Sequence, residues 1–310
     1  MSQIIFDISS IMKKYKRYNK SLLIGPDTTR PDVKSKRSIK YLTEFLENAG
    51  NVIDVISWHQ YYFNGRTADA HDFLDPEIFN ILAWQISKIC KIKTDMNLTE
   101  KPLWLAETSS AWGGGSPLFS DRFIAGFIWL DKLGLSAKMG IDIVIRQSIF
   151  NGYYALIGDD YNPNPDYWIS ILYKKLVGQE VIPCYNVASK NIRLYCHCTN
   201  NIQKQSFPSV TVFGMNMQDV SAKIRIEGLS PIGPTGITPL KILSYTLTSK
   251  VSLLNKNIYL NGEILKLRGD NELPNFVPKV VDGKPYVIMP PYSIVFWVIP
   301  TKNKICYNLD

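Results

Sequence analysis

The sequence predicts an α/β unit followed by an all-β unit, and two observations carry this prediction. In the first 176 residues, stretches with apolar residues at helical spacing alternate with short, wholly apolar runs, the pattern of helices and buried parallel strands. From about residue 180 the helical spacing is lost, and short alternating runs between turn residues replace it. We therefore assign residues 1–178 to the first unit and 179–310 to the second.

The order of elements in the first unit is helix and strand in strict alternation. Asp75-Pro76-Glu77 is a helix start, because Asp caps a helix and Pro suits its first turn. Continuously apolar strands favour a parallel sheet covered on both faces. The expected helices cover residues 3–18, 35–48, 73–92, 121–139 and 166–176, and the expected strands cover 22–24, 52–58, 103–106 and 141–145. In the second unit, a β-sandwich or similar module is predicted from runs at 192–196, 210–213, 222–226, 245–247, 264–267, 287–289 and 293–299.

Composition limits the function classes. With 45% hydrophobic and 20% charged residues, the chain is neither disordered nor collagen-like. Its formal charge is +8, and residues 1–40 hold ten basic against three acidic side chains, which is +7 of that total. Such a basic edge is typical of a polyanion-binding surface, although a solvated helix face is an equally good interpretation. No zinc-finger spacing or RNP signature is present, so nucleic acid is a disfavoured partner.

Three further features bear on location and metals. No apolar run is long enough to span a bilayer, and the residues after Met1 lack the basic and apolar pattern of a secretory signal. The spacing Cys196-His197-Cys198 is too tight for a zinc knuckle and no second Cys/His pair follows, so we expect no metal. Nothing in the sequence calls for a cofactor.

Chemically active residue types follow the predicted strands, at the end where α/β barrels carry their sites. A carboxylate, Glu107, ends a buried strand and precedes a loop with three glycines, whose backbone can approach a ligand closely. A carboxylate among aromatic, amide and guanidinium groups suits sugar chemistry, since it can attack an anomeric carbon. A structural ion pair is the plainer alternative. The strand-end residues are Asp27, His59, Tyr61, Tyr62, Glu107, Arg146 and Gln147.

Several segments are similar to the heparanases, glycoside hydrolases of family 79. The resemblance runs from about residue 8 to the end, and its longer motifs are specific. They are Trp-His-Gln-Tyr-Tyr-Phe-Asn-Gly-Arg-Thr at 58–67, Glu-Thr-Ser-Ser-Ala-Trp-Gly-Gly-Gly at 107–115, Gly-Phe-Ile-Trp-Leu-Asp-Lys-Leu-Gly at 126–134, Pro-Asn-Pro-Asp-Tyr-Trp at 163–168, His-Cys-Thr-Asn at 197–200 and Leu-Asn-Gly at 260–262.

The resemblance implies a retaining endo-β-glucuronidase that acts on heparan sulfate, with Glu107 as its nucleophile. It also implies a disulfide between Cys198 and Cys306, and so an oxidising compartment, with a secreted, extracellular-matrix or lysosomal location. Heparan sulfate or heparin would be the partner, with membrane or matrix association through proteoglycans. The implied substrate-binding residues are His59, Tyr61, Arg66, Trp112, Gly113, Gly114, Gln147 and Tyr154, and the implied polyanion-binding residues are Lys34, Lys36 and Arg37.

The departures from the family pattern matter for activity. The family's acid/base is the Glu of an Asn-Glu-Pro motif that closes barrel strand four, and no Asn-Glu-Pro occurs in this chain. We therefore expect the C-terminal half of a (β/α)₈ TIM barrel, strands five to eight, followed by a β-sandwich. The missing half could come from the N-terminal heparanase portion as a separate chain, or the sequence could be a truncated product. The alternative function is a non-catalytic heparan-sulfate-binding protein. Trp112 also stands where the family usually has Tyr, and Asp32 where a base is usual.

Overall fold

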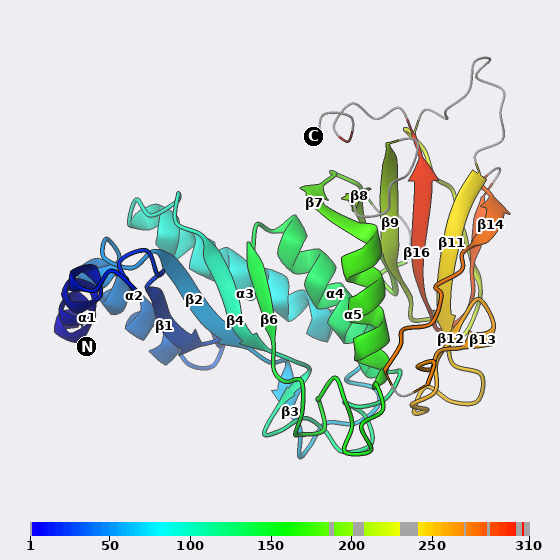
Figure 1. Ribbon diagram of the computed structural model, residues 1–310, viewed down its shortest axis with the longest axis horizontal. Helices are drawn as coiled ribbons and strands as arrows, with labels where there is room; N and C mark the ends of the chain where they lie inside the picture. The colour runs from blue at the N-terminus through cyan, green and yellow to red at the C-terminus, as the bar shows by residue number, and fades with distance from the viewer. Residues whose placement is uncertain are drawn as a thin grey trace.

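A computed structural model describes residues 2–185, 189–200, 208–229, 241–269, 271–283, 286–301 and 306. Figure 1 shows the two large sheets of these residues, which differ in kind; two-stranded ribbons accompany them, one of which pairs β3 (Phe63–Asn64) with β5 (Ala111–Trp112). The N-terminal part forms a parallel sheet with helices, and the C-terminal part forms a larger antiparallel sheet beside it. The change in the spacing of apolar residues near residue 180 therefore corresponds to a change from a parallel to an antiparallel sheet.

The parallel sheet has four strands in the order β1-β2-β4-β6. Its register places Thr29 opposite His59, and His59 opposite Glu107, so the carboxyl ends of three neighbouring strands meet at one edge. The central strand β2 is almost wholly buried. Val55, Ile56 and Trp58 supply its apolar side chains, and the polar Ser57 and Gln60 are buried with them. The bounds are β1 (Ile24–Thr29), β2 (Val55–Gln60), β4 (Leu103–Thr108) and β6 (Ile143–Arg146).

Five helices accompany this sheet, close to the predicted ranges. They are α1 (Ser2–Lys14), α2 (Arg37–Ala49), α3 (Pro76–Asp95), α4 (Ala125–Lys138) and α5 (Pro165–Leu176). The predicted start of α3 is correct, since the Asp75 side chain accepts a hydrogen bond from the Glu77 backbone N–H.

The expectation that both faces of the parallel sheet are covered is wrong for the described residues. In Figure 1 helices α2, α3 and α4 lie behind the sheet, and the side toward the viewer carries no helix. On β6 the side chains of Ile143 and Ile145 are 40% and 43% exposed. An apolar strand pattern predicts that the side chains of a strand are buried, but it does not show which segment covers them.

The antiparallel sheet has eight strands, seven of them in the order β13-β12-β11-β16-β9-β8-β7, with β14 paired to β11. A separate two-stranded ribbon pairs β10 with β15. The sequence prediction missed β7, β12 and β14, and the run predicted at 264–267 is a strand only at its first residue. The bounds are β7 (Val177–Val181), β8 (Ile192–Thr199), β9 (Ser209–Asn216), β10 (Ala222–Ile224), β11 (Lys241–Thr248), β12 (Tyr259–Leu260), β13 (Glu263–Ile264), β14 (Lys279–Asp282), β15 (Val287–Met289) and β16 (Ser293–Pro300).

The two sheets share one hydrophobic core. Helices α4 and α5 lie between them, and Phe213 and Phe296 of the antiparallel sheet join the same buried cluster as Trp58 and Phe127. On the opposite face, Val212 and Trp297 pack in a second cluster that includes residues of the β10–β15 ribbon. A layered arrangement of this kind fixes the helices against both sheets, and so fixes the edge that carries the strand ends.

A buried ion pair also crosses the junction. Arg193 on β8 donates to the Asp131 carboxylate of α4 at 2.5 Å, and Tyr195 donates to the same oxygen at 2.6 Å. Asp131 has no exposed surface, so these donors compensate the loss of water around its charge.

Candidate active site

The carboxyl ends of β1, β2 and β4 bring Asp27, His59 and Glu107 into a row. His59 Nδ1 lies 3.6 Å from Glu107 Oε2, and His59 Nε2 lies 3.6 Å from Asp27 Oδ1. Asp27 occupies a β-bulge with φ of +56°, and its backbone N–H donates to Ser57 Oγ at 3.2 Å. All three side chains are partly exposed, 49% for Asp27, 29% for His59 and 37% for Glu107. The row is therefore open to a ligand.

A tyrosine fixes the orientation of the Glu107 carboxylate. Tyr61 Oη donates a hydrogen bond to Glu107 Oε1 at 2.7 Å. Burial, followed by this bond to Glu107, raises the pKa of Tyr61 far above that of an ordinary phenol. Tyr61 therefore keeps its proton at every pH of interest and acts only as a donor here. Because it occupies Oε1, Oε2 remains as the more available oxygen.

The glycine loop after β4 presents bare backbone beside these groups. Gly113, Gly114 and Gly115 all have φ between +84° and +91°, a region that favours glycine. A Cβ at Gly113 or Gly114 would meet nothing within 4 Å, whereas one at Gly115 would come within 2.7 Å of the Tyr154 backbone nitrogen. Gly115 is thus required for packing, while the other two leave room for a ligand.

The same packing holds Tyr154 near Tyr61. The Tyr153 N–H donates to the Gly114 carbonyl at 2.6 Å, which ties the two loops together. The Tyr154 and Tyr61 rings stack with their centroids 6.2 Å apart. Of the two predicted substrate-binding tyrosines, Tyr61 therefore contacts the Glu107 carboxylate directly, and Tyr154 is next to it through its stack with Tyr61.

The other predicted site residues are placed less directly. The Gln147 backbone N–H donates to the Thr108 carbonyl at 3.0 Å, so Gln147 follows β6 next to the end of β4. Trp112 is 36% exposed, and the Arg30 guanidinium lies 4.3 Å from its ring centroid. Arg66 is exposed, and its backbone N–H donates to Asn64 Oδ1 at 3.1 Å. None of these three positions contradicts a role in substrate binding, which stays a prediction.

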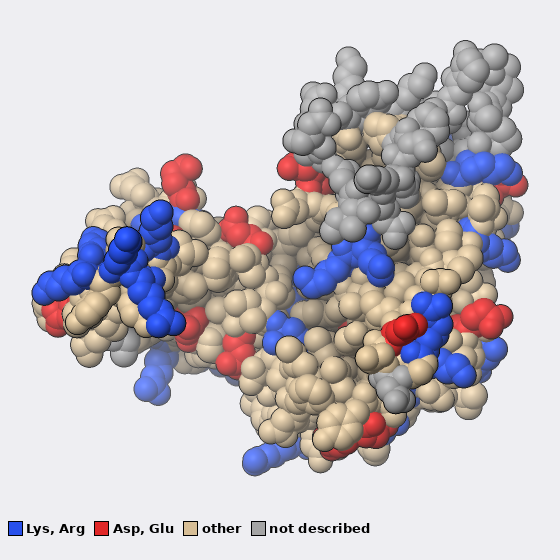
Figure 2. Space-filling view, in the orientation of Figure 1, with Lys and Arg blue, Asp and Glu red and all other residues tan. Residues whose placement is uncertain are grey.

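Exposed basic side chains mark the N-terminal part. Lys34, Lys36 and Arg37 are all exposed, around the start of α2. In Figure 2 further Lys and Arg side chains gather over α1, at the left end of the molecule. The basic edge predicted from the sequence is therefore a real surface feature of the described residues.

Arg146 does not belong to the mouth, although the sequence analysis placed it there. Its Nη1 lies 2.8 Å from Asp166 Oδ2, and both side chains are nearly buried. Its other amino group donates to the Tyr154 carbonyl at 2.5 Å, and its guanidinium lies 4.5 Å from the Trp129 ring centroid. It supports the Tyr154 loop, and its burial keeps its N–H groups from a ligand at the strand ends.

Sequence reasoning missed a buried lysine below the site. Lys132 of α4 has no exposed surface. Its ammonium donates to Thr108 Oγ1 and to the Ser109 carbonyl, the latter at 2.6 Å, and Thr108 Oγ1 donates to the Gln60 carbonyl at 2.5 Å. Burial lowers the pKa of Lys132 well below its ordinary value. The chain of bonds joins α4 to the ends of β4 and β2, next to Glu107 and Tyr61. An Asp-Lys pair inside an otherwise apolar helix was the available clue.

Two disulfides join strands and loops of the antiparallel part. One links Cys198 to Cys306, the pair that the resemblance implied, and the other links Cys184 to Cys196. The second pair was not predicted. Among the described residues, no group of three or more His, Cys, Asp or Glu side chains is arranged to hold a metal ion. Within the same residues, no helix combines the length and the apolar character that a membrane crossing requires.

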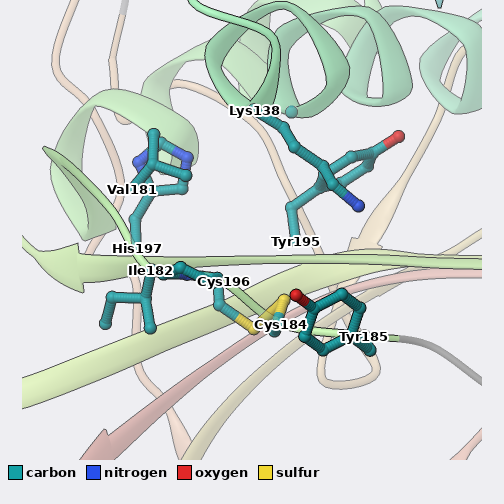
Figure 3. A pocket seen from close by; sticks show the side chains of 10 residues that line it. Lys138, Val181, Ile182, Cys184, Tyr185, Tyr195, Cys196 and His197 are labelled. Atoms are coloured by element: carbon teal, nitrogen blue, oxygen red, sulfur yellow. A yellow bond between two sulfur atoms is a disulfide. The ribbon is translucent and has the colours of Figure 1, made fainter.

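A cavity of about 190 Å³ lies away from the strand ends, between the C-terminal half of α4 and strands β7 and β8. Figure 3 shows Tyr195 and His197 on the side of β8 toward the helix that carries Lys138, with the Cys184–Cys196 disulfide on the other side. Because none of its lining residues belongs to the row of Asp27, His59 and Glu107, it is separate from the candidate active site.

Comparisons with known proteins agree with the geometry. Residues 5–134 match the model of the glycosyl hydrolase family 79 N-terminal domain. Mouse heparanase is 37% identical over 297 residues, 91% of this chain and 52% of the relative. The hyaluronoglucuronidase of Hirudo nipponia is 33% identical, over 96% of this chain and 59% of the relative. Human inactive heparanase-2 is 31% identical, over 96% of this chain and 51% of the relative. The chain spans about half the length of the curated relatives it matches.

Solved structures agree on the fold at low sequence identity. A 4-O-α-L-rhamnosyl-β-D-glucuronidase from Fusarium oxysporum aligns with a TM-score of 0.68 at 14% identity, over 96% of this chain and 64% of that one. An α-L-arabinofuranosidase from Thermotoga maritima aligns with a TM-score of 0.63 at 15% identity, over 96% and 61%. The described residues thus share the fold of a large part of these TIM-barrel glycoside hydrolases, with four parallel strands and an antiparallel sheet.

Proposed function

Since the chain belongs to the heparanase family of glycoside hydrolases, we propose that it carries the nucleophile of a retaining endo-β-glucuronidase acting on heparan sulfate. The observation that carries this proposal is the Glu107 carboxylate at the end of β4, held at Oε1 by Tyr61 and open at Oε2. A fixed, accessible carboxylate at the carboxyl edge of a parallel sheet is the arrangement that nucleophilic glycoside cleavage needs.

The chemistry would proceed in two steps. Glu107 Oε2 attacks the anomeric carbon, the bond to the leaving oxygen breaks, and an acid donates a proton to that oxygen. Water then attacks the glycosyl-enzyme, loses its proton to the same group acting as base, and releases Glu107. Tyr61 keeps its bond to Oε1 throughout, which holds the attacking oxygen in line.

The acid/base requires a second carboxyl group, roughly 5–5.5 Å from the nucleophile in retaining enzymes. In the described residues, Asp27 reaches Glu107 only through His59, so it is not the group that we assign to this role. We propose instead that the four parallel strands are half of an eight-stranded barrel. The other half would supply the second carboxyl group, either on a separate chain or in a longer form of this one. This chain by itself would then be inactive.

The partner would be heparan sulfate or heparin, with the exposed Lys34, Lys36 and Arg37 as additional contacts for its anionic groups. Two disulfides favour an oxidising compartment, consistent with a secreted, matrix or lysosomal protein that reaches membranes through proteoglycans.

The test uses Glu107→Gln in the protein that carries this chain together with its complementing half. Cleavage of heparan sulfate should be abolished, because an amide cannot form the glycosyl ester, while heparin binding should persist. Glu227→Gln, a matched change in the surface pair with Arg225, is the control and should keep full activity. Retained cleavage in the Glu107 variant would refute the nucleophile assignment.

A non-catalytic polyanion-binding role is the second candidate. It is favoured by the separation of the two carboxylates of the row, Asp27 and Glu107, by His59, and by the basic surface over α1 and α2. In that case heparin affinity should fall steeply with salt through counterion release, and the triple change of Lys34, Lys36 and Arg37 to Gln should reduce the salt dependence. Salt-insensitive binding would count against this role.

A further inference from the structure

Arg30 stands at the same sheet edge as Glu107. It directly follows Thr29, which pairs with His59, which in turn pairs with Glu107. Its backbone is held firmly, because Ser38 Oγ donates to the Arg30 carbonyl and Gln85 Nε2 donates to the Pro31 carbonyl, both at 2.9 Å. The side chain therefore projects from a fixed position rather than from a free loop.

The Arg30 guanidinium is aligned by an aromatic ring. It lies 4.3 Å from the ring centroid of Trp112, the residue that opens the glycine loop after Glu107. This pair bridges the segments that follow β1 and β4, across the end of β2. A guanidinium on an indole face is attracted by the ring quadrupole and keeps its edge N–H groups free for a planar oxyanion.

Among the described residues, no carboxylate forms an ion pair with Arg30. The side chain is half-buried, and this burial lowers its pKa, while Asp32 has the opposite electrostatic effect. A partly desolvated cation without a bound carboxylate gains more from an incoming anion than a fully hydrated surface lysine does.

We propose, building on the function proposed above, that Arg30 and Trp112 together bind an anionic group, carboxylate or sulfate, on a sugar unit next to the bond that Glu107 attacks. The ring aligns the guanidinium and offers an apolar face to the sugar, and the guanidinium donates to the anionic oxygens. The pair would thus determine which substituted units are accepted beside the cleavage position.

The surface beside Arg30 fits a chain of such sugars. A cavity of about 340 Å³ opens there and is lined by hydroxyl groups, by two guanidinium groups and by one carboxylate. It would accommodate the next units of an anionic glycan, with Asp32 as the group that disfavours an anion close to it. The lining residues used here are Thr28, Thr29, Arg30, Asp32, Ser35 and Arg37.

The test is equilibrium binding in the Glu107→Gln background, so that the glycan is not cut. The probes are size-defined heparan sulfate oligosaccharides in three forms: native, carboxyl-reduced and desulfated. Arg30→Gln should weaken binding of the native probe about tenfold, the scale of one charge-assisted pair. It should change binding by less than about twofold for the form that lacks the recognised group, and that form identifies the anion as carboxylate or sulfate.

Companion variants separate this pair from a general charge effect. Trp112→Ala should weaken native binding as Arg30→Gln does, and Trp112→Phe should restore it. Lys223→Gln is the matched control, because Lys223 also lies over a ring, that of Tyr286 at 4.9 Å, but in the β10–β15 ribbon.

Three results would overturn the inference: equal losses for all probes, no loss in Arg30→Gln, or an equal loss in Lys223→Gln. The length of each probe is checked after the binding measurement: a probe cut by Glu107→Gln would refute the nucleophile assignment, whereas the comparison of variants on uncut probe tests the Arg30–Trp112 pair.

Discussion

Tyr61 Oη and Glu107 Oε1 are joined by a hydrogen bond of 2.7 Å between the ends of two neighbouring parallel strands. One carboxylate oxygen is thereby held while the other faces His59 at 3.6 Å. The bond is charge-assisted and partly shielded from water, conditions under which a hydrogen bond contributes most to positioning.

Tyr61→Phe should therefore lower kcat by about 10- to 100-fold with little change in KM, the rate equivalent of a lost hydrogen bond to a charged group. Steady-state kinetics on a defined oligosaccharide will measure this. The matched control is Tyr173→Phe. Tyr173 lies on α5 and packs on Phe213 of the antiparallel sheet, so this change should leave both kcat and KM unchanged. A rise in KM alone would mean that Tyr61 binds substrate without orienting the nucleophile.

Lys132→Met should destabilise the protein and slow catalysis together. Methionine fills the space but leaves the Ser109 carbonyl and the Thr108 hydroxyl without their buried donor, at a cost of about 1–3 kcal/mol for each unsatisfied group. Denaturant unfolding and kcat will test this. Lys138→Met, an exposed position of the same helix, is the control. Unchanged unfolding in Lys132→Met would contradict the role given to these bonds.

The two disulfides should differ in what they contribute. Cys198–Cys306 spans 108 residues of sequence and Cys184–Cys196 spans 12, so the longer loop restricts the unfolded chain more. Replacing both cysteines of the long-range pair by Ala should lower the free energy of unfolding by about 2 kcal/mol more than the same change in the short-range pair. Equal losses in urea denaturation would show that native packing, and not the loop length, sets the difference.

His197 should make stability fall on acidification. It is 2% exposed, and burial lowers its pKa below the ordinary value of 6.5. The unfolded chain takes up the proton at the ordinary pKa and the folded chain only at lower pH. The free energy of unfolding therefore decreases as the pH falls from about 6.5. Replacing His197 by Phe should flatten this slope between pH 7 and pH 5, and parallel slopes for the two proteins would contradict the assignment.

The strand ends were predictable because parallel strands carry their carboxyl ends to one edge, so that Asp27, His59 and Glu107 had to meet. Apolar runs bounded by turn residues were enough to find the central strands. Strand β7 follows α5 with no turn residue between them, so no turn signal in the sequence marked where the strand begins. Its identity as a strand depends on pairing with β8.

Other contacts depend on tertiary structure that pattern cannot show. Arg146 lies at the end of β6, yet its side chain turns to Asp166, because alternate positions of a strand face opposite sides. Lys132 is buried because α4 lies between two sheets. The sequence pattern of one helix does not show how many neighbouring layers cover it. The Arg30–Trp112 pair joins two loops that are 82 positions apart in the numbering, and only the assembled sheet edge brings them together.

The most direct test of the nucleophile assignment is covalent trapping with an activated 2-deoxy-2-fluoro-glucuronide, followed by peptide mass spectrometry. The electron-withdrawing fluorine slows release of the glycosyl-enzyme, so a retaining enzyme accumulates the ester. The protein with its complementing half should carry one sugar on the peptide that contains Glu107, and Glu107→Gln should carry none. A label on a different carboxylate, or continued turnover with inversion and no label, would contradict the account.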